Sequence, residues 1–330
     1  MLIDCGWVES APEDALLLLL SCSSMDLDRL QTLKSNRNLQ LVSRIKGTNF
    51  LTNPVEFHRL LKQNNSTHLQ TKTYDLAVKQ DCIEFFEKAS KSTDFNVEWV
   101  LRSNEETTQT RVIKDVNKFR NLRQQMSFSK QDPCISSEEI IQLRLNNPLI
   151  IKQKKVQVRS YFLIASVNPL VVLFRDGVAL LTSDLEKSDE KDLNLNDIDI
   201  KLTLPELNDM MMENQQTSNP NWASEYLRPY MQNITRNIVA HIQDNLDDRV
   251  GRFEFLAFDV VVSKQLEVFV TNVDCGPKLT INNVLRPTDI NDIIGELMNI
   301  VLEVNALKQS GIPILKLKST RKFEPIILGE

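Results

Sequence analysis

Glycine is scarce in this chain, with only eight glycines among 330 residues. That is well under the usual share of roughly 7%. Nucleotide-binding enzymes commonly place glycine where the backbone must approach a phosphate group. The sequence therefore offers few places for a glycine-rich phosphate loop.

Cysteine and histidine are also few, and they are scattered. The five cysteines stand at positions 5, 22, 82, 134 and 275, the three histidines at 58, 68 and 241, and no CxxC pair occurs. A structural zinc site needs about four clustered ligands, so this pattern argues against one. We expect reduced thiols that pack as small apolar side chains in a reducing compartment.

Long apolar runs are missing as well. Residues 16–22 are apolar, but a membrane-spanning helix needs about 20 such residues. Acidic residues precede this run at positions 4, 9, 13 and 14, whereas a signal peptide begins with basic residues. We expect a buried strand here and a cytosolic protein.

The overall composition is that of a globular protein. Apolar residues make up 42% and charged residues 25%, and the formal net charge is −5. This balance argues against attraction of the whole protein to nucleic acid. The length suffices for one large domain or two modest ones.

Hydrophobic periodicity predicts an α+β fold rather than a doubly wound parallel sheet. The predicted strands are 14–22, 39–43, 96–101, 155–166, 170–175, 252–262 and 266–273, and the last two form an antiparallel pair. The predicted helices are 54–63, 81–91, 222–246 and 287–307. Residues 136–145 fit a helix or a strand.

Two other segments complete this pattern. The Asp176-Gly177 pair predicts a hairpin turn after the strand at 170–175. Residues 183–221 are polar, acidic in their first half, with little apolar periodicity, and we expect a mobile insert there. The predicted organisation is an N-terminal α/β subdomain (1–63), a central subdomain (64–145) and a C-terminal subdomain (146–330) that carries the insert.

Three stretches resemble the tubulin–tyrosine ligase-like family, in the family's order. Residues 140–170 (IIQLRLNNPLIIKQKKVQVRSYFLIASVNPL) are similar to a pattern with "NPLLI" and "KFDIR", and residues 174–183 (FRDGVALLTS) to "YRDGLARLTS". Residues 253–277 (FEFLAFDVVVSKQLEVFVTNVDCGP) resemble "FELFGFDFMLD" followed by "EVN". Weaker likeness joins residues 97–103 (VEWVLRS) to "WIVKP".

The resemblance implies an ATP-grasp-like fold, in which helices flank antiparallel sheets and a cleft lies between subdomains. It also implies site residues, which we carry over only where this sequence matches the motif. Arg159 corresponds to the arginine that faces the transferring group. The positions implied for ATP are Arg102, Gln142, Lys155 and Thr182, and those implied for Mg²⁺ are Asp259, Asn272 and Asp274.

Several motif positions depart from the family. The lysine of "WIVKP" is Arg102, which is not a conservative exchange, and residues 104–112 (NEETTQTRV) contain no glycine. The aspartate of "KFDIR" is Gln157, and the asparagine of "LTN" is Ser183. The "EVN" motif has become Asn272-Val273-Asp274. Two carboxylates and an amide form a poor site for two metal ions.

The retained residues also fit purely structural roles. Lys155 and Arg159 alternate on one strand face, where they are either solvated or ion-paired. Asp259 lies in an apolar strand and needs a partner, so a salt bridge to Lys155 or Arg159 is at least as good a prediction as a metal. Trp99 and Trp222 are predicted as core or interface aromatics.

Three functions remain open. The first is a pseudoenzyme of this family that acts as a microtubule-associated or complex-subunit protein, in the cytoplasm and cytoskeleton, with the cilium or flagellum axoneme added by analogy. Its partners would be tubulin and other microtubule-associated proteins, with neither nucleic acid nor membrane. The second is an active, divergent ATP-dependent tubulin ligase of the polyglutamylase or glycylase type. The third is an ATP-binding regulator without turnover. ATP and Mg²⁺ are cofactors only if the cleft functions.

Basic residues that could meet acidic tubulin tails form three groups. They are Arg44, Lys46, Arg59 and Lys62, then Lys152, Lys154 and Lys155, and finally the segment 316–322 (KLKSTRK), which is the densest. A run of charge is usually a solvated face, so each group is a weak candidate.

Overall fold

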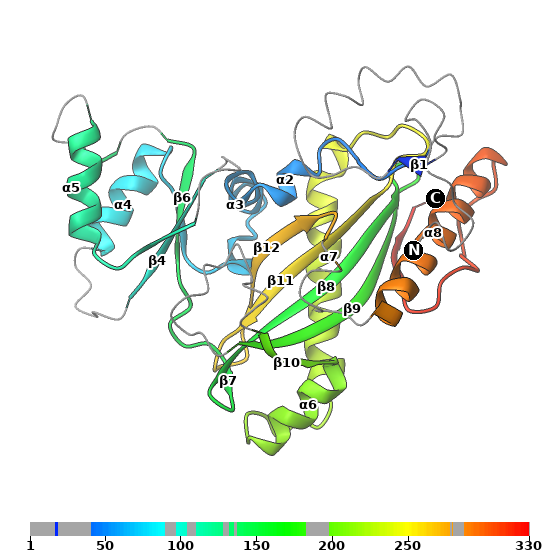
Figure 1. Ribbon diagram of the computed structural model, residues 1–330. Helices are drawn as coiled ribbons and strands as arrows, with labels where there is room; N and C mark the ends of the chain where they lie inside the picture. Colours follow the sequence, from blue (N-terminus) through cyan, green and yellow to red (C-terminus); the bar gives the residue numbers. More distant parts are fainter. Residues whose placement is uncertain are drawn as a thin grey trace.

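The computed structural model describes residues 17–18, 41–89, 97–103, 110–127, 132–134, 137–182, 198–277, 279 and 287–329. These residues form a two-stranded, a four-stranded and a seven-stranded sheet, with helices packed against the two larger ones (Figure 1). The predicted α+β class with antiparallel sheets flanked by helices, of the ATP-grasp-like kind, is confirmed.

The four-stranded sheet is antiparallel and has the order β3-β6-β4-β5. Its strands are β3 (Thr73–Asp75), β6 (Glu139–Leu143), β4 (Trp99–Ser103) and β5 (Arg111–Ile113). The helices α4 (Lys79–Ala89) and α5 (Val116–Met126) complete a core of aromatic rings with it. That core contains Tyr74, Phe85, Phe86, Trp99 and Phe119, so the prediction that Trp99 is a core residue is confirmed.

The seven-stranded sheet has the path β10-β9-β8-β11-β12, with β7 paired to β8 and β13 to β9. The strands are β7 (Ile150–Ile151), β8 (Lys154–Ser166), β9 (Val171–Thr182), β10 (Ile198–Leu202), β11 (Glu254–Val262), β12 (Val268–Cys275) and β13 (Glu324–Leu328). The predicted antiparallel pairing of the strands now called β11 and β12 is confirmed.

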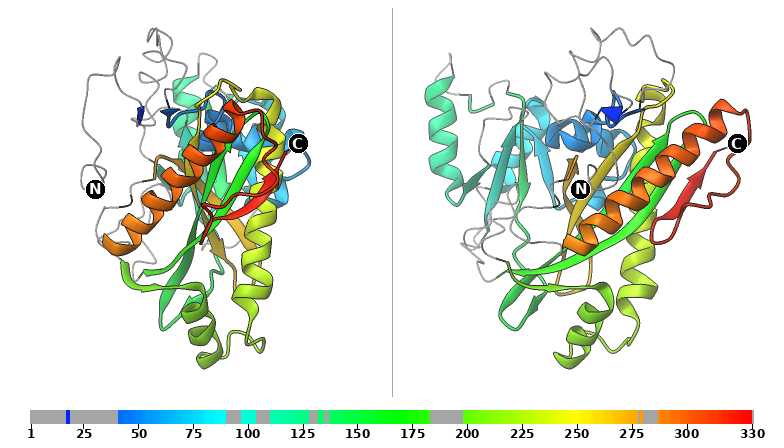
Figure 2. Two further views of the ribbon diagram at one scale, coloured as in Figure 1. Left: turned by 90° about the vertical axis from the view of Figure 1, so that its right-hand side faces the viewer. Right: turned by 45° about the vertical axis from the view of Figure 1, so that its right-hand side comes forward.

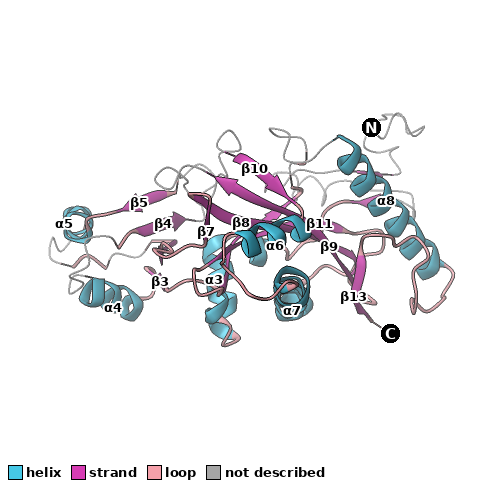
Figure 3. Ribbon diagram, turned by 90° about the horizontal axis from the view of Figure 1, so that it is seen from below, coloured by secondary structure: helices cyan, strands magenta, loops and turns pink. Residues whose placement is uncertain are grey.

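Helices cover the two faces of this sheet differently. The π-helical turn η4 (Ala223–Leu227) continues into α7 (Arg228–Ile242), which packs on one face together with α2 (Asn49–Thr52), α3 (Pro54–Gln63) and α6 (Leu204–Glu213). The long helix α8 (Pro287–Gln309) packs on the opposite face (Figure 2). Figure 3 shows α6 and α7 on one side of the strands and α8 at the far end.

The connection between α3 and the small sheet contains a 3₁₀ turn, η2 (Thr67–Leu69), and a second 3₁₀ turn, η5 (Gln243–Asn245), follows α7. The N-terminal strands β1 (Leu17–Leu18) and β2 (Leu41–Val42) pair in parallel. The strands predicted at 14–22 and 39–43 are confirmed at Leu17–Leu18 and Leu41–Val42, and apart from residue 43 the rest of both ranges lies outside the described residues.

The predicted hairpin turn at Asp176-Gly177 is wrong. Both residues lie inside β9, which runs on to Thr182 opposite β8. Gly177 is required there because a Cβ atom would lie 2.0 Å from the Arg159 carbonyl oxygen. The sequence predicted a turn because glycine is common in turns. Here Gly177 instead allows β8 and β9 to approach each other closely.

The expected mobile insert at 183–221 is only partly described, since residues 183–197 lie outside the described part. Residues 198–221 are ordered. Thr203 caps α6 in a reciprocal capping box with Glu206. Leu204, Leu207 and Met211 then enter the main core, so hydrophobic packing fixes a segment whose polar composition hid its apolar positions.

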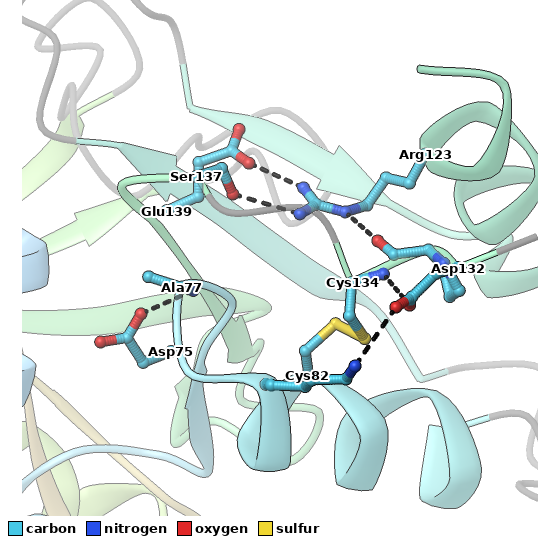
Figure 4. Close-up of a disulfide and its surroundings, with 10 residues drawn as sticks. Asp75, Ala77, Cys82, Arg123, Asp132, Cys134, Ser137 and Glu139 are labelled. Carbon is cyan, nitrogen blue, oxygen red and sulfur yellow. Dashed lines mark hydrogen bonds and ion pairs between the residues drawn. A yellow bond between two sulfur atoms is a disulfide. The ribbon is translucent and has the colours of Figure 1, made fainter. Parts of the chain in front are cut away.

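The expectation of reduced thiols is wrong for three cysteines. Cys82 of α4 and Cys134 form a disulfide with a Cα–Cα distance of 5.8 Å (Figure 4). Cys275 is also disulfide-bonded. Arg123 of α5 holds the segment that contains Cys134, because it donates to the Pro133 carbonyl and to the Glu139 carboxylate at 2.9 and 2.8 Å. Cys5 and Cys22 lie outside the described residues.

Within the described part of the chain, no helix is long and apolar enough to cross a bilayer.

Candidate functional site

The residues singled out in the sequence lie on two sheets. Alternation in β4 and β6 sends Trp99, Leu101 and Ile141 into the aromatic core, so Arg102 and Gln142 share the other face of the small sheet. Both are buried, with 3% and 2% of their surface exposed.

Arg102 connects this small sheet to the large one. Its Nη1 donates to the carbonyl oxygen of Thr271 at 2.6 Å. A register shift between β11 and β12 leaves Thr271 as the extra residue of a β-bulge, and a bulge leaves one residue out of the ladder. The bulge therefore supplies the carbonyl that Arg102 reaches.

The other candidates gather on one face of the large sheet. Val156, Val158, Phe258 and Val273 point into the core under α7. Lys155, Arg159, Asp259, Asn272 and Asp274 therefore share the opposite face. The register places Arg159, Asp259 and Asn272 side by side across three strands, and it places Lys155 opposite Thr182. The structure thus makes Arg159, Asp259 and Asn272 neighbours on this face, and it places Lys155 beside Thr182.

Arg159 and Asp259 form a bidentate ion pair. The guanidinium Nε and Nη2 donate to the two carboxylate oxygens at 2.7 and 2.8 Å. Both side chains are largely buried, with 12% and 3% of their surface exposed. Of the alternatives that the sequence left open for Asp259, the structure therefore contains the salt bridge to Arg159.

The electrostatics of the pair follow from this geometry. Burial by itself would lower the pKa of the Arg159 guanidinium, but the charge and hydrogen bonds of Asp259 outweigh it and hold that pKa above its ordinary value. The neighbouring Tyr161 hydroxyl is also buried, and burial together with the nearby Asp259 charge raises the pKa of Tyr161 to about 12. Both groups keep their protons at neutral pH.

The donor set does not fit a pair of Mg²⁺ ions. Magnesium takes oxygen ligands in nearly octahedral geometry, commonly from carboxylates. Both oxygens of Asp259 accept hydrogen bonds from Arg159, so the first carboxylate of the implied set is already engaged by a cation. The described residues contain no group of three or more His, Cys, Asp or Glu side chains arranged to hold a metal ion.

An unpaired acceptor on Gln142 is compatible with binding of a nucleotide base. The side-chain oxygen Oε1 of Gln142 is buried and has no hydrogen-bond partner among the residues that the structure describes. An unpaired buried acceptor costs roughly 1–3 kcal/mol. The exocyclic amine of adenine is a donor that would satisfy this oxygen.

Several of the basic residues predicted from the sequence are buried or ion-paired, whereas Lys46 and Lys152 are exposed. Arg44 is buried and pairs with Glu254 at 3.2 Å, so its prediction as a surface cation is wrong. Arg59 pairs with Asp75 at 2.7 Å, and Lys62 with Asp81 at 2.7 Å. Lys155 is buried as well, with 6% of its surface exposed.

The C-terminal group remains accessible. Lys316, Lys318, Arg321 and Lys322 are exposed. Lys322 and Arg321 each lie within ion-pair distance of Asp292 on α8, at 2.9 and 3.5 Å.

Sequence reasoning missed Thr271, which receives Arg102. A bulge depends on the register between two strands, so the sequence carried no signal for it. It also missed Glu254, whose carboxylate is buried with 2% of its surface exposed and accepts hydrogen bonds from the Ile45 N–H and the Thr48 hydroxyl. The signal available in the sequence was a charged residue, Glu254, at the start of an otherwise largely apolar strand.

Comparison with known proteins points the same way as the motifs. Residues 32–203 match the model of the tubulin-tyrosine ligase family. The human protein named inactive polyglycylase TTLL10 is 26% identical over 210 residues, covering 58% of this chain and 31% of the relative. Tubulin glycylase 3D of Tetrahymena thermophila is 19% identical over 234 residues, covering 64% of this chain and 22% of the relative.

A third relative aligns along more of the chain. The protein named probable tubulin polyglutamylase ttll-15 of Caenorhabditis elegans is 24% identical over 302 residues, covering 84% of this chain and 53% of the relative. The chain thus spans between about a fifth and about half of the length of these relatives.

Proposed function

This chain belongs to the tubulin-tyrosine ligase family, and we propose that it is a non-catalytic member that works by binding a polypeptide. The observation that carries the proposal is the Arg159–Asp259 pair. By resemblance, Arg159 would face the transferring group and Asp259 would hold Mg²⁺. Here the two side chains bind each other instead, in a bidentate ion pair.

The energetics support inactivity. Breaking a buried ion pair by withdrawing one partner costs roughly 3–5 kcal/mol. A metal ion that recruited Asp259 would have to overcome that cost with the help of Asn272 and Asp274 alone. Loss of single preorganised contacts typically lowers a rate about a hundredfold or more, and here the first lysine, the bridging glutamate and the glycines are all replaced.

The partner that we propose is an acidic polypeptide, for which tubulin tails are the model because the relatives are named as tubulin-modifying proteins. The exposed cations Lys316, Lys318, Arg321 and Lys322 provide a surface of the required sign. On this reading the protein is microtubule-associated, and the cilium or flagellum rests on analogy with the family alone.

Co-sedimentation with microtubules tests the binding function. We expect binding that weakens as salt is raised, because exposed charges are screened, and that falls when Lys316, Lys318, Arg321 and Lys322 are changed together to Gln. The matched control changes the exposed Lys79, Lys118, Lys201 and Lys264 to Gln, and these residues lie outside the three candidate groups. Equal loss in both variants, or no binding at low salt, would contradict the proposal.

A ligase assay tests inactivity. We expect no incorporation of labelled glycine or glutamate into tubulin in the presence of Mg·ATP. Incorporation that disappears in Asp259→Asn would establish the alternative of a divergent active ligase, in which Arg159 releases Asp259 when the metal arrives.

A second candidate function is an ATP-binding regulator without turnover, and the unpaired Oε1 of Gln142 favours it. This function requires Arg102 and Lys155 to meet phosphates and Thr182 to line the same site. The thermal midpoint of the purified protein should then rise with Mg·ATP and not with Mg²⁺ alone. A rise that Gln142→Leu and Lys155→Ala both abolish would establish ATP as a ligand.

A further inference from the structure

The turn that follows α3 contains two overlapping Asn-x-Ser/Thr sequences. They are Asn64-Asn65-Ser66 and Asn65-Ser66-Thr67, and this sequence pattern is the acceptor for N-linked glycans in secreted proteins. Apart from Ser66, every residue from position 62 to 68 is exposed. The pattern therefore lies on a surface turn, where an attached sugar chain has room.

The two asparagines are not equivalent. The side-chain amide of Asn64 donates to the Leu60 carbonyl at 2.9 Å and caps the end of α3, so a sugar on that nitrogen would disturb the cap. Asn65 has the left-handed backbone angle φ 53° at the tip of the turn. Its partner in the acceptor sequence, Thr67, is exposed.

A third acceptor sequence, Asn233-Ile234-Thr235, lies in the middle of α7. Asn233 is exposed, but Thr235 is fully buried and its hydroxyl donates to the Met231 carbonyl. This sequence is the natural comparison for the turn, since the motif is the same and its place in the fold differs.

An Asn-x-Ser/Thr sequence occurs by chance in many proteins that never meet the glycosylation machinery. In this chain, the disulfides indicate that the acceptor sequence does meet that machinery. Cys82, Cys134 and Cys275, three of the five cysteines, are disulfide-bonded, and structural disulfides persist in the secretory pathway and outside the cell but are rare in the cytosol. N-linked glycans are added in the same pathway.

We propose that Asn65 carries an N-linked glycan, on a chain that acquires its disulfides in the secretory pathway. In the reaction, the Asn65 side-chain nitrogen forms a bond to C1 of the first sugar of a lipid-diphosphate oligosaccharide and loses one proton. The bond from that sugar to the diphosphate breaks, and the lipid diphosphate leaves with the electron pair.

The inference goes beyond the proposed function and refines its partner. A glycosylated chain would meet its acidic polypeptide in the lumen of the secretory pathway or outside the cell. A glycan on Asn65 therefore keeps the proposed binding of an acidic polypeptide but excludes tubulin as its model, so only one of the two partners can be right. Loss of catalysis does not depend on the compartment, so the ligase assay and the glycan test can fail separately.

The test is a peptide map of the native protein, isolated from its own cells with free thiols blocked before lysis. We expect the peptide with Asn65 to appear only after peptide-N-glycosidase treatment, with position 65 converted to aspartate. We also expect Cys82 and Cys134 in one disulfide-linked peptide pair. Unmodified Asn65, a glycan confined to Asn64 or Asn233, or free thiols at Cys82 and Cys134 would overturn the proposal.

Matched variants made in the same cells locate the acceptor. Asn65→Gln and Thr67→Ala should both remove the glycan and shift the protein to the mobility of the glycosidase-treated form. Asn64→Gln and Thr67→Ser keep the Asn65 acceptor sequence and should leave the mobility unchanged. A glycan that survives in Asn65→Gln would contradict the assignment, and recovery of Asn64→Gln in the soluble fraction checks that the turn tolerates substitution.

Discussion

Arg159 and Asp259 lie directly opposite each other on β8 and β11, and the guanidinium of the first donates to both oxygens of the second. The two residues are a hundred positions apart in the sequence, and the sheet brings them into register. Each of them therefore fixes the orientation of the other.

The first prediction concerns this pair. Arg159→Met should lower the free energy of unfolding by roughly 3–5 kcal/mol, because it leaves the Asp259 carboxylate buried without a partner. Arg159→Met combined with Asp259→Leu should recover most of the loss, because neither charge remains. Urea denaturation measures both variants. A single variant that loses under about 1 kcal/mol would mean that solvent already reaches the pair.

The second prediction concerns Gln142. Gln142→Leu removes an acceptor that has no partner within the described part of the chain, and the volume of the side chain changes little. We expect the free energy of unfolding without nucleotide to stay the same or rise by up to about 1 kcal/mol. A large loss in urea denaturation would show that the Gln142 oxygen has a partner in solution.

The third prediction concerns the pH dependence of stability. Burial raises the pKa of the Glu254 carboxyl to about 7, although Arg44 opposes the shift. Since the folded state binds this proton more tightly than the unfolded state, whose pKa is near 4.5, the contribution to stability is complete below pH 4.5. It is lost as the pH rises through about 7.

Comparison with Glu254→Gln isolates that contribution. The variant keeps the shape of the side chain and cannot titrate. The difference in unfolding free energy between the natural chain and the variant should change with pH between 4.5 and 7 by on the order of 3 kcal/mol. A difference that stays constant across this window would show that Glu254 does not titrate there.

The fourth prediction concerns the Cys82–Cys134 disulfide. It closes a loop with a sequence separation of 52 residues, and a loop of that size is worth roughly 4 kcal/mol in the chain-entropy view. Changing both cysteines to Ser should lower the thermal midpoint, and reductant should then have less effect on the double variant than on the natural chain. If the double variant and the natural chain had the same thermal midpoint without reductant, the disulfide would not stabilise the fold.

The fifth prediction concerns Gly177. An added methyl group would meet the Arg159 carbonyl at 2.0 Å, so Gly177→Ala should force β8 and β9 apart and destabilise the fold. Gly295→Ala is the matched control, since open space surrounds a Cβ at that position. Thermal melts of the two variants measure the contrast, and equal midpoints would contradict the close approach.

Sequence reasoning succeeded where hydrophobic periodicity is strong. It predicted α3, α7, α8 and the β11–β12 pair. The family resemblance, and not periodicity, implied Arg159, Asp259 and Asn272 as site residues, and they lie on one sheet face. These features depend on local patterns that a chain carries along its length.

What it missed depends on contacts between distant residues. Gly177 looked like a turn because its reason is the Arg159 backbone on another strand. The Cys82–Cys134 pairing joins α4 to a segment beyond α5, and scattered cysteines give no pairing. Arg44 looked like a surface cation because Glu254, its partner, is 210 positions away.

The hydrogen bond from Arg102 to the Thr271 carbonyl bears on how the molecule loses its structure. It joins a strand of the small sheet to an edge strand of the large one at a point where both partners are buried. Opening the small sheet would expose this carbonyl and strip the guanidinium of an acceptor, so local opening there is coupled to β12. Backbone amides of β4 and β12 should therefore exchange with solvent deuterium at similar rates, as one cooperative unit.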